Sequence, residues 1–158
     1  MKYLQKIVNL LLFIYNTFMK NLIIWVIIPL IAIQFIKVDV KQTLITNEKD
    51  KLKASKEIEE ILNRSCADCH SNHVNYPWYD KIAPASWYVK YHVKKGREVV
   101  NFDKWNSYSS EKKRKIAEKI PKAIKIRMPL PTYLWLHSNA KLSKDDKRIL
   151  NKWAKELQ

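Results

Sequence analysis

The sequence predicts an all-α fold in which an N-terminal membrane-anchor helix precedes a compact helical domain. Glycine occurs once in 158 residues, at Gly96, so few positions can take the positive φ angles that tight β-hairpins need. Residues 22–36 carry no charge and are apolar except for Gln34, and apolar residues further along recur at helical spacing. The length allows one domain and an additional segment. We divide the chain into an anchor (1–37), a tether (38–53) and a helical domain (54–158).

The anchor is predicted to span the membrane at about residues 22–36. As a helix this run is roughly 22 Å long, shorter than a hydrocarbon core of about 30 Å, unless Lys37 reaches the interface with its ammonium group. Residues 7–19 are also mostly apolar, but Lys20 follows them, and its charge at mid-bilayer would cost about 2.5–3.5 kcal/mol. The earlier stretch therefore either lies along the interface as a helix or is absent because translation starts at Met19. No Ala-x-Ala pattern follows, so we expect an uncleaved anchor.

Charge predicts the orientation of the chain. Lys2, Lys6 and Lys20 precede the span, which places the N-terminus in the cytoplasm, while a large domain after the span is translocated despite its charge. The net charge of +15 could attract an acidic protein or anionic headgroups, or it could be a solvated lysine surface. Export of the domain argues against nucleic acid as a partner.

Helical patterns begin with a segment that starts at Ser55 and places Ile58, Ile61 and Leu62 on one face. A second helix is predicted from Pro84 to about Val100, because proline is favoured at the first helical position. Gly96 lies inside this second helix and either permits close packing or marks an early end.

Two further helices are predicted in the C-terminal part. One begins at Ser109 and is bent or broken at Pro121, after which the prolines at 129 and 131 favour an extended stretch. The other begins at Ser143, with Asp146 three residues later in a pattern resembling a capping box. We expect its apolar face to pack on the first helix of the domain. That face consists of Ile149, Leu150, Trp153 and Leu157.

Cys66, Ala67, Asp68, Cys69 and His70 spell C-x-x-C-H, the most specific chemical motif in the chain. Two thiols at this spacing can add to the two vinyl groups of one haem, and the adjacent imidazole then becomes an axial ligand of the iron. Both cysteines of the chain lie in the motif, so there is no separate disulfide framework. A zinc site completed by His70 or His73 and a thioredoxin-type dithiol are the alternatives.

The sixth iron position has four candidate ligands. Met128 lies in the proline-flanked stretch and could turn its thioether inward, although core filling is the more common role of methionine. His92 on the second predicted helix is the alternative, since His73 is too close to His70 to reach the opposite face. His137 is assigned to a loop. Trp78, Trp87 and Leu130 are expected to line the pocket.

Several segments together resemble the haem-binding domain family of exported bacterial proteins, over about residues 54–156. They are the C-x-x-C-H motif, Tyr76-Pro77-Trp78-Tyr79, Ser86-Trp87, Gly96-Arg97-Glu98 and Met128-Pro129-Leu130-Pro131. The resemblance implies a c-type cytochrome-like domain with one covalently attached haem c, behind a membrane segment. With the charge pattern, it places the anchor in a bacterial inner membrane and the domain in the periplasm.

The function predicted from these residues is electron transfer without catalysis. Iron held by both His70 and Met128 has no open position, so the domain would exchange electrons with a partner that is unknown and could be acidic. One alternative is a haem peroxidase or gas sensor with an open sixth position, in which His92 and Arg97 would act on the distal side. The other is a zinc-stabilised interaction module.

Overall fold

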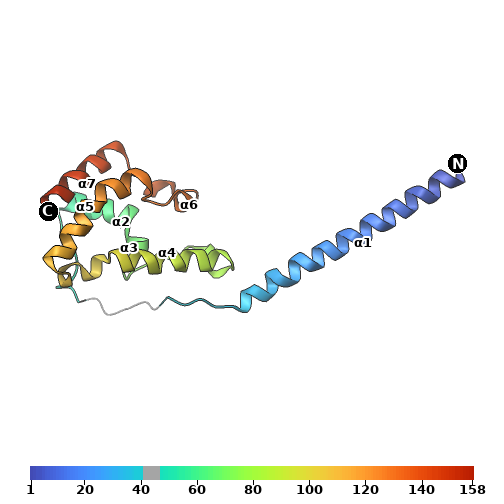
Figure 1. The fold of residues 1–158 in the computed structure, drawn as a ribbon, viewed down its shortest axis with the longest axis horizontal. Helices are drawn as coiled ribbons and strands as arrows, with labels where there is room; N and C mark the ends of the chain where they lie inside the picture. The colour runs from blue at the N-terminus through green and yellow to red at the C-terminus, as the bar shows by residue number, and fades with distance from the viewer. Residues whose placement is uncertain (41–46) are drawn as a thin grey trace. The chain divides into compact units, whose positions relative to one another are not determined.

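The structure is a computed structural model that describes residues 1–40 and 47–158, and it confirms the all-α prediction (Figure 1). No strand occurs in the described residues. The part of the predicted tether at 41–46 lies outside them. The α-helices (α) and 3₁₀ helices (η) are α1 Lys2–Ala32, η1 Ile33–Phe35, α2 Lys56–Ser65, α3 Ala67–His70, η2 Trp78–Lys81, α4 Ala85–Val99, η3 Phe102–Ser107, α5 Ser110–Ile126, α6 Pro131–Leu134, η4 Ser138–Ala140 and α7 Lys144–Glu156.

The chain forms two compact units. The first consists of Met1–Val38 and Trp78–Trp87, and the second of Asp39–Pro77 and Tyr88–Gln158. In the first unit, α1 and η1 form a helix over Lys2–Phe35 that is long and apolar enough to cross a membrane. This helix passes through Lys20 without a break, so residues 7–19 do not form a helix of their own, which was one of the two alternatives that the sequence left open. The physical reason is local, because neither glycine nor proline occurs before Pro29 to interrupt it.

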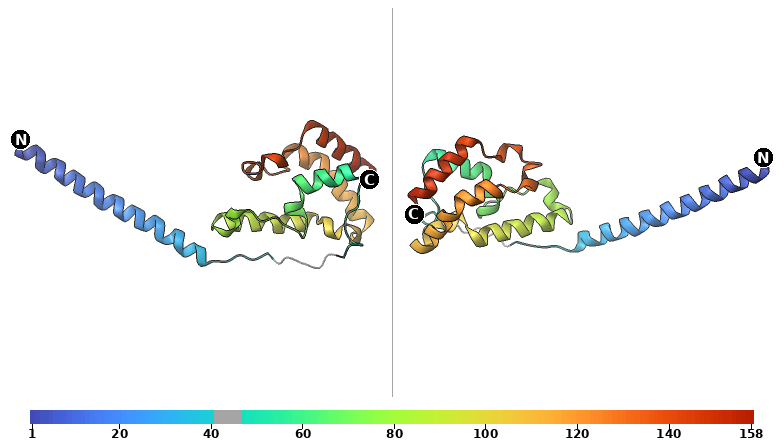
Figure 2. Two further views of the ribbon diagram at one scale, coloured as in Figure 1. Left: turned by 180° about the vertical axis from the view of Figure 1, so that it is seen from behind. Right: turned by 45° about the horizontal axis from the view of Figure 1, so that its top comes forward.

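The core of the second unit is formed by one face of each of three helices. The predicted residues Ile58, Ile61 and Leu62 of α2 are buried there, together with Ile124 of α5 and Leu150 of α7. Burial of each such side chain contributes about 1.5–3 kcal/mol. The last helix contacts α2 as expected, but its main partner is α5, and Figure 2 shows α5 and α7 side by side.

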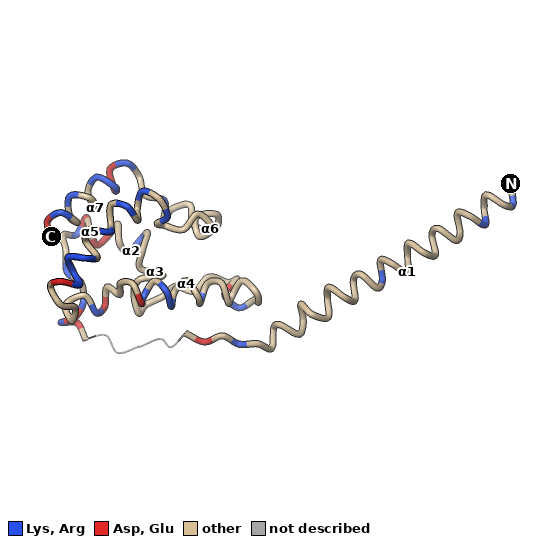
Figure 3. The backbone as a smooth tube through the Cα atoms, in the orientation of Figure 1, with Lys and Arg blue, Asp and Glu red and all other residues tan. Residues whose placement is uncertain are grey.

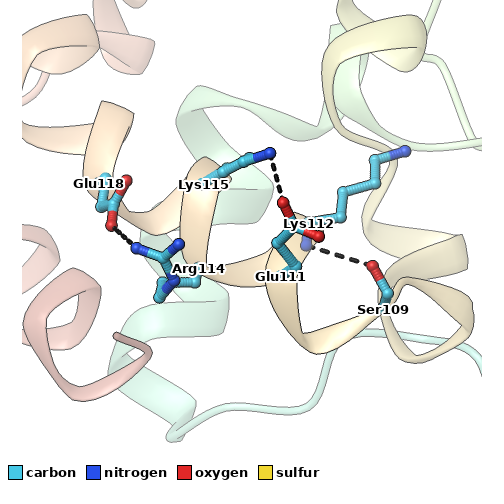
Figure 4. Close-up of polar contacts among 6 residues, drawn as sticks. All are labelled: Ser109, Glu111, Lys112, Arg114, Lys115 and Glu118. Atoms are coloured by element: carbon cyan, nitrogen blue, oxygen red, sulfur yellow. Dashed lines mark hydrogen bonds and ion pairs between the residues drawn. The ribbon is translucent and has the colours of Figure 1, made fainter.

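The sequence allowed a bend or a break at Pro121, and the break does not occur, because α5 continues from Ser110 to Ile126. A proline inside a helix costs about 3 kcal/mol through the lost hydrogen bond and the clash of its ring. Burial of Ala117 and Ile124 on either side of Pro121 offsets this cost. The first turn is fixed by Ser109, whose side chain accepts from the Lys112 backbone N–H (Figure 4).

The folded domain begins earlier than residue 54. The Leu52 N–H donates to the Phe102 carbonyl at 2.7 Å, and the Asn106 side chain donates to the carbonyls of Lys49 and Lys51 at 3.0 and 2.9 Å. Residues 49–52 are therefore held against η3 and form part of the second unit.

The start of α7 is fixed by the predicted capping box. The Ser143 side chain accepts from the Asp146 N–H at 2.9 Å, and the Asp146 carboxylate accepts from the Ser143 N–H at 2.8 Å. Arg64, the basic residue in the last turn of α2, pairs with the same carboxylate at 2.6 Å. Burial raises the pKa of Asp146, but the bonds from Ser143 and the Arg64 charge outweigh it, so the pKa lies below its usual value.

We expect Asp146→Ala to lower the free energy of unfolding by about 1 kcal/mol, the usual effect of losing a helix cap. Because the folded pKa is lowered, the contribution of this carboxylate is present above pH ~4 and is lost as the pH falls through the folded pKa. Urea unfolding of the full chain at a series of pH values measures this. The control is Asp145→Ala, which removes an exposed carboxylate paired with Arg148 and should change stability by less than about 0.5 kcal/mol. Equal effects of the two substitutions would contradict the assignment.

Candidate functional site

The C-x-x-C-H motif is a single helical turn that follows α2. The Cys69 and His70 N–H groups both donate to the Cys66 carbonyl, at 3.2 and 3.0 Å. Residues four apart lie on the same side of a helical turn. Cys66 and His70 accordingly line one cavity, whereas Cys69 is not among its lining residues.

This cavity belongs to the second unit and has a volume of about 410 Å³, within the usual range for cofactor sites. Its walls come from α2, from the end of α4, and from η3, α5 and α7. They are mostly apolar and contain no Asp or Glu. The residues that line it are Leu62, Cys66, His70, Val99, Val100, Phe102, Trp105, Lys112, Lys115, Ile116, Lys119, Ile120, Ala123, Ile124, Met128, Leu150 and Trp153.

The His70 ring is oriented by backbone carbonyls. Its Nδ1 lies 3.0 Å from the Gly96 carbonyl and 3.0 Å from the Val100 carbonyl, so Nδ1 carries the proton and donates. These bonds leave Nε2 available. A histidine that binds a metal through one ring nitrogen usually donates the N–H of the other to a carbonyl or a carboxylate, as His70 does here. Burial lowers the pKa of His70 against the opposing effect of the two carbonyls, which keeps the imidazole in the neutral form that binds metals.

Gly96 allows α4 to approach the motif. A Cβ added at this position would lie 2.5 Å from the Cys69 carbonyl oxygen and 3.2 Å from Cys69 Cβ. The φ angle of Gly96 is not positive, so glycine is needed here for space rather than for backbone conformation. Of the two roles that the sequence allowed, close packing inside the helix is the one observed.

The loop after the motif is fixed by buried polar groups. Arg97 Nε donates to the Ser71 carbonyl at 2.8 Å, and the Asp103 carboxylate accepts from the Asn72 N–H at 2.5 Å. The Asn101 side chain donates to the Asn72 side-chain oxygen at 2.7 Å, and all three of these Asn and Asp residues are buried. Arg97 therefore holds the backbone next to the motif and does not line the cavity, which gives no support to a distal catalytic role.

Met128 is brought to the cavity by the end of α5. Its N–H donates to the Ala123 carbonyl at 2.9 Å, in the turn that closes the helix. Among the residues that line the cavity, Met128 is the one Cys, His, Met or Tyr that does not belong to the C-x-x-C-H motif.

The other histidines lie elsewhere. The His92 ring makes edge contacts with Tyr88 at 4.3 Å and Tyr91 at 5.3 Å between centroids. The His137 ring stacks on Tyr133 at 4.1 Å, and His73 lines a separate cavity next to Asp68. None of them lines the cavity that holds His70.

Trp78, Trp87 and Leu130, which the sequence suggested for the pocket, are not among the residues lining this cavity. Both tryptophans belong to the first unit, with the end of α1. Trp105 lines the cavity instead. Sequence reasoning missed Phe102 and the face of α5 that carries Ile116, Ile120 and Ala123, although the spacing of these three α5 residues is a helical signal.

Three lysines of α5 also line the cavity. Lys112, Lys115 and Lys119 follow one another at intervals of three and four residues, so they lie along one side of the helix. Figure 4 shows the Lys112 and Lys115 side chains, with Lys115 paired to Glu111 at 2.5 Å. The cavity thus combines apolar walls with a cationic row, and this suits a large apolar ligand that carries carboxylates.

The two thiols are in protonated form at neutral pH. Burial, with a smaller effect of neighbouring Cys69, raises the pKa of Cys66 to about 12, and burial with the Asp68 charge raises the pKa of Cys69 to about 11. A redox dithiol needs a low thiol pKa, so this environment argues against that alternative. No group of three or more Cys, His, Asp or Glu within the described residues is arranged to hold a metal ion, which leaves the zinc alternative without support.

The residues that line the cavity fit haem. Cys66, the Nε2 atom of His70 and the Met128 thioether belong to an apolar cavity with a cationic side, and each is a known type of contact to haem.

Comparison with curated proteins and with solved structures found no match. A family model described as a haem-binding domain matches residues 28–156, beginning within α1 and ending at the last residue of α7. The chain therefore belongs to the haem-binding domain family.

Proposed function

We propose that this protein is a membrane-anchored monohaem electron carrier of the c type. Cys66 and Cys69 would hold one haem covalently, and His70 and Met128 would be the ligands of its iron. The observation that carries the proposal is the cavity, which brings Met128 from the end of α5 to the same apolar space as Cys66 and His70.

Attachment requires no oxidant. Each thiol would add across one vinyl double bond of the haem, with sulfur bonding to the carbon next to the ring and the thiol hydrogen going to the terminal carbon. The C-x-x-C-H turn places Cys66 on the cavity side with His70, and the hydrogen bond from the Cys69 N–H to Cys66 keeps the two sulfur-bearing residues in one turn.

Bound haem supplies a one-electron couple, and this chain's side chains determine its environment. Phe102, Trp105 and Trp153 supply apolar walls to the cavity, while the Gly96 and Val100 carbonyls hold the His70 ring in position. A thioether ligand raises the reduction potential relative to a second imidazole. With His70 and Met128 both bound to the iron, the domain would transfer electrons and would not activate a substrate.

The cationic row on α5 is assigned to the haem propionates. If Lys112, Lys115 and Lys119 lie near them, replacing all three by glutamine removes positive charge beside the iron, stabilises the ferric form and lowers the reduction potential. Potentiometric titration of the full chain measures this shift. The control replaces Lys144, Lys152 and Lys155 of α7, an equal charge change at residues that do not line the cavity. An equal shift in both triple variants would show that general charge, and not propionate pairing, is measured.

The proposal of a membrane anchor is based on α1, and the proposal of an acidic redox partner is based on the basic residues of α7. The helix over Lys2–Phe35 holds the protein in a bacterial inner membrane, with the haem-binding domain in the periplasm. Lys144, Lys147, Arg148 and Lys152 line one shallow surface depression on α7, and Figure 3 shows Lys and Arg positions recurring along this helix. An acidic redox partner would bind transiently to this basic surface. Such an encounter weakens as salt increases.

The decisive experiment is expression of the full chain with haem-attachment machinery, followed by acid–acetone extraction and a pyridine haemochrome spectrum. Haem that stays on the protein, with a sulfur-to-iron charge-transfer band in the near infrared, supports the proposal. Retained haem with a high-spin spectrum that responds to CO or peroxide would favour a sensor or peroxidase. Zinc without iron in the purified protein would overturn both haem functions.

A further inference from the structure

Gln34 is the polar residue in the apolar run of the anchor, and its side chain is fully engaged. Its amide NH₂ donates to the Leu30 carbonyl at 2.8 Å and to the Ala83 carbonyl at 3.0 Å. Its amide oxygen accepts from the Ala83 N–H at 2.9 Å. One side chain therefore pairs with both backbone polar groups of Ala83, which is buried, and with a carbonyl of the last turn of α1.

A third hydrogen bond joins the same two segments. The Trp87 indole N–H donates to the Ile36 carbonyl at 2.9 Å, just after η1. The last carbonyls of a helix have no partner within it, and an unpaired carbonyl at the edge of the hydrocarbon costs several kcal/mol. Trp78–Trp87 thus supplies partners to the end of α1, and both segments lie within the range matched by the family.

Large apolar side chains are exposed near the contact between the end of α1 and residues Trp78–Trp87. Phe35 is 81% exposed and Trp78 is 71% exposed, while Ile36 and Ile82 are also exposed. Lys37 and Lys81 are their close neighbours in the sequence. Tryptophan combined with lysine at the end of an apolar helix is typical of the membrane–water interface, where rings lie at headgroup level and ammonium groups reach the water.

We infer that Trp78–Trp87 docks on the end of α1 through Gln34 and Ile36, and that Trp78 and Ile82 insert into the interfacial layer of the lipid bilayer. This inference rests on the anchoring function proposed for α1. The occupant of the apolar surface is lipid, because the surface is continuous with the end of the helix assigned to the membrane. The sequence suggested a different role for Trp78 and Trp87, as haem contacts.

The test is photo-crosslinking of the full chain in nanodiscs of phosphatidylethanolamine and phosphatidylglycerol. A photoreactive amino acid replaces Ile82, Trp25 within α1, or Ile126, an exposed apolar residue at the end of α5. Lipid adducts at Ile82 and Trp25, with few or none at Ile126, support the inference. Adducts at Trp25 but not at Ile82 overturn it and leave the anchor intact. Absence of adducts at Trp25 overturns the anchor and the inference together, and equal capture at Ile82 and Ile126 also overturns the inference.

A substitution tests the docking contact. Gln34→Leu keeps the size of the side chain but removes its bonds to Ala83, so lipid capture at Ile82 should fall several-fold while capture at Trp25 remains. The matched control is Gln5→Leu, at the other glutamine of the Lys2–Phe35 helix, which should leave both unchanged. Capture at Ile82 that is insensitive to Gln34→Leu would overturn the docking contact. Crosslinks from Ile82 to a second protein would overturn lipid as the occupant of this surface and indicate a protein partner.

Discussion

Gly96→Ala is expected to separate the C-x-x-C-H turn from α4. Alanine in a helix normally gains about 0.5–1 kcal/mol over glycine, and the φ angle of Gly96 imposes no strain on a side chain. The new Cβ would, however, lie 2.5 Å from the Cys69 carbonyl oxygen, a backbone atom that cannot rotate away. Relief requires movement of the motif or of α4, at a cost of about 1–3 kcal/mol for overpacking.

The same movement would disturb the His70 ring, because the Gly96 carbonyl is one of its two hydrogen-bond acceptors at Nδ1. We therefore expect Gly96→Ala to lower the urea midpoint of the full chain and also to reduce the amount of retained haem with a low-spin spectrum. Lys94→Ala, on the exposed side of the same helix, is the control and should change stability by less than about 0.5 kcal/mol. A variant as stable as the wild type, with an unchanged spectrum, would show that the close approach is unimportant.

Local patterns predicted most of the fold because the helices are marked by their own residues. The α2 face with Ile58, Ile61 and Leu62 and the cap at Ser143 are short-range signals, and both were correctly interpreted. The sequence left a break at Pro121 open, because the penalty for proline is local, whereas the packing of α5 on α7 that offsets it depends on residues distant in sequence.

The site was predictable only in part, for a similar reason. Cys66, Cys69 and His70 form a motif that a sequence displays directly, whereas the carbonyls of Gly96 and Val100 that orient His70 have no side-chain signature. From the sequence alone, the lysines of α5 could be a solvated surface, whereas in the structure Lys112, Lys115 and Lys119 line the cavity. Trp78 and Trp87 do not line this cavity, and aromatic composition alone does not say which surface a ring covers, so their haem contact stays a prediction.

Met128→Ala is expected to have the largest effect on the proposed chemistry. Residues 38–158 contain one methionine, since Met1 and Met19 lie in or next to α1, so a sulfur-to-iron band in this domain has one source. Removal of the thioether opens the sixth position. The ferric spectrum should lose the near-infrared band and become high-spin, the potential should fall, and the ferrous form should bind CO.

The matched control is Leu130→Ala, two residues away and outside the lining of the cavity, which should leave the spectrum and the potential unchanged. A Met128→Ala protein that remains low-spin without CO binding would remove Met128 from the iron. In that case His92→Ala becomes the informative variant, although the His92 ring packs between Tyr88 and Tyr91 and does not line the cavity. The comparison separates two kinds of protein, because a closed iron that opens only on mutation belongs to an electron carrier, whereas an iron already open to CO in the wild type belongs to a sensor or an enzyme.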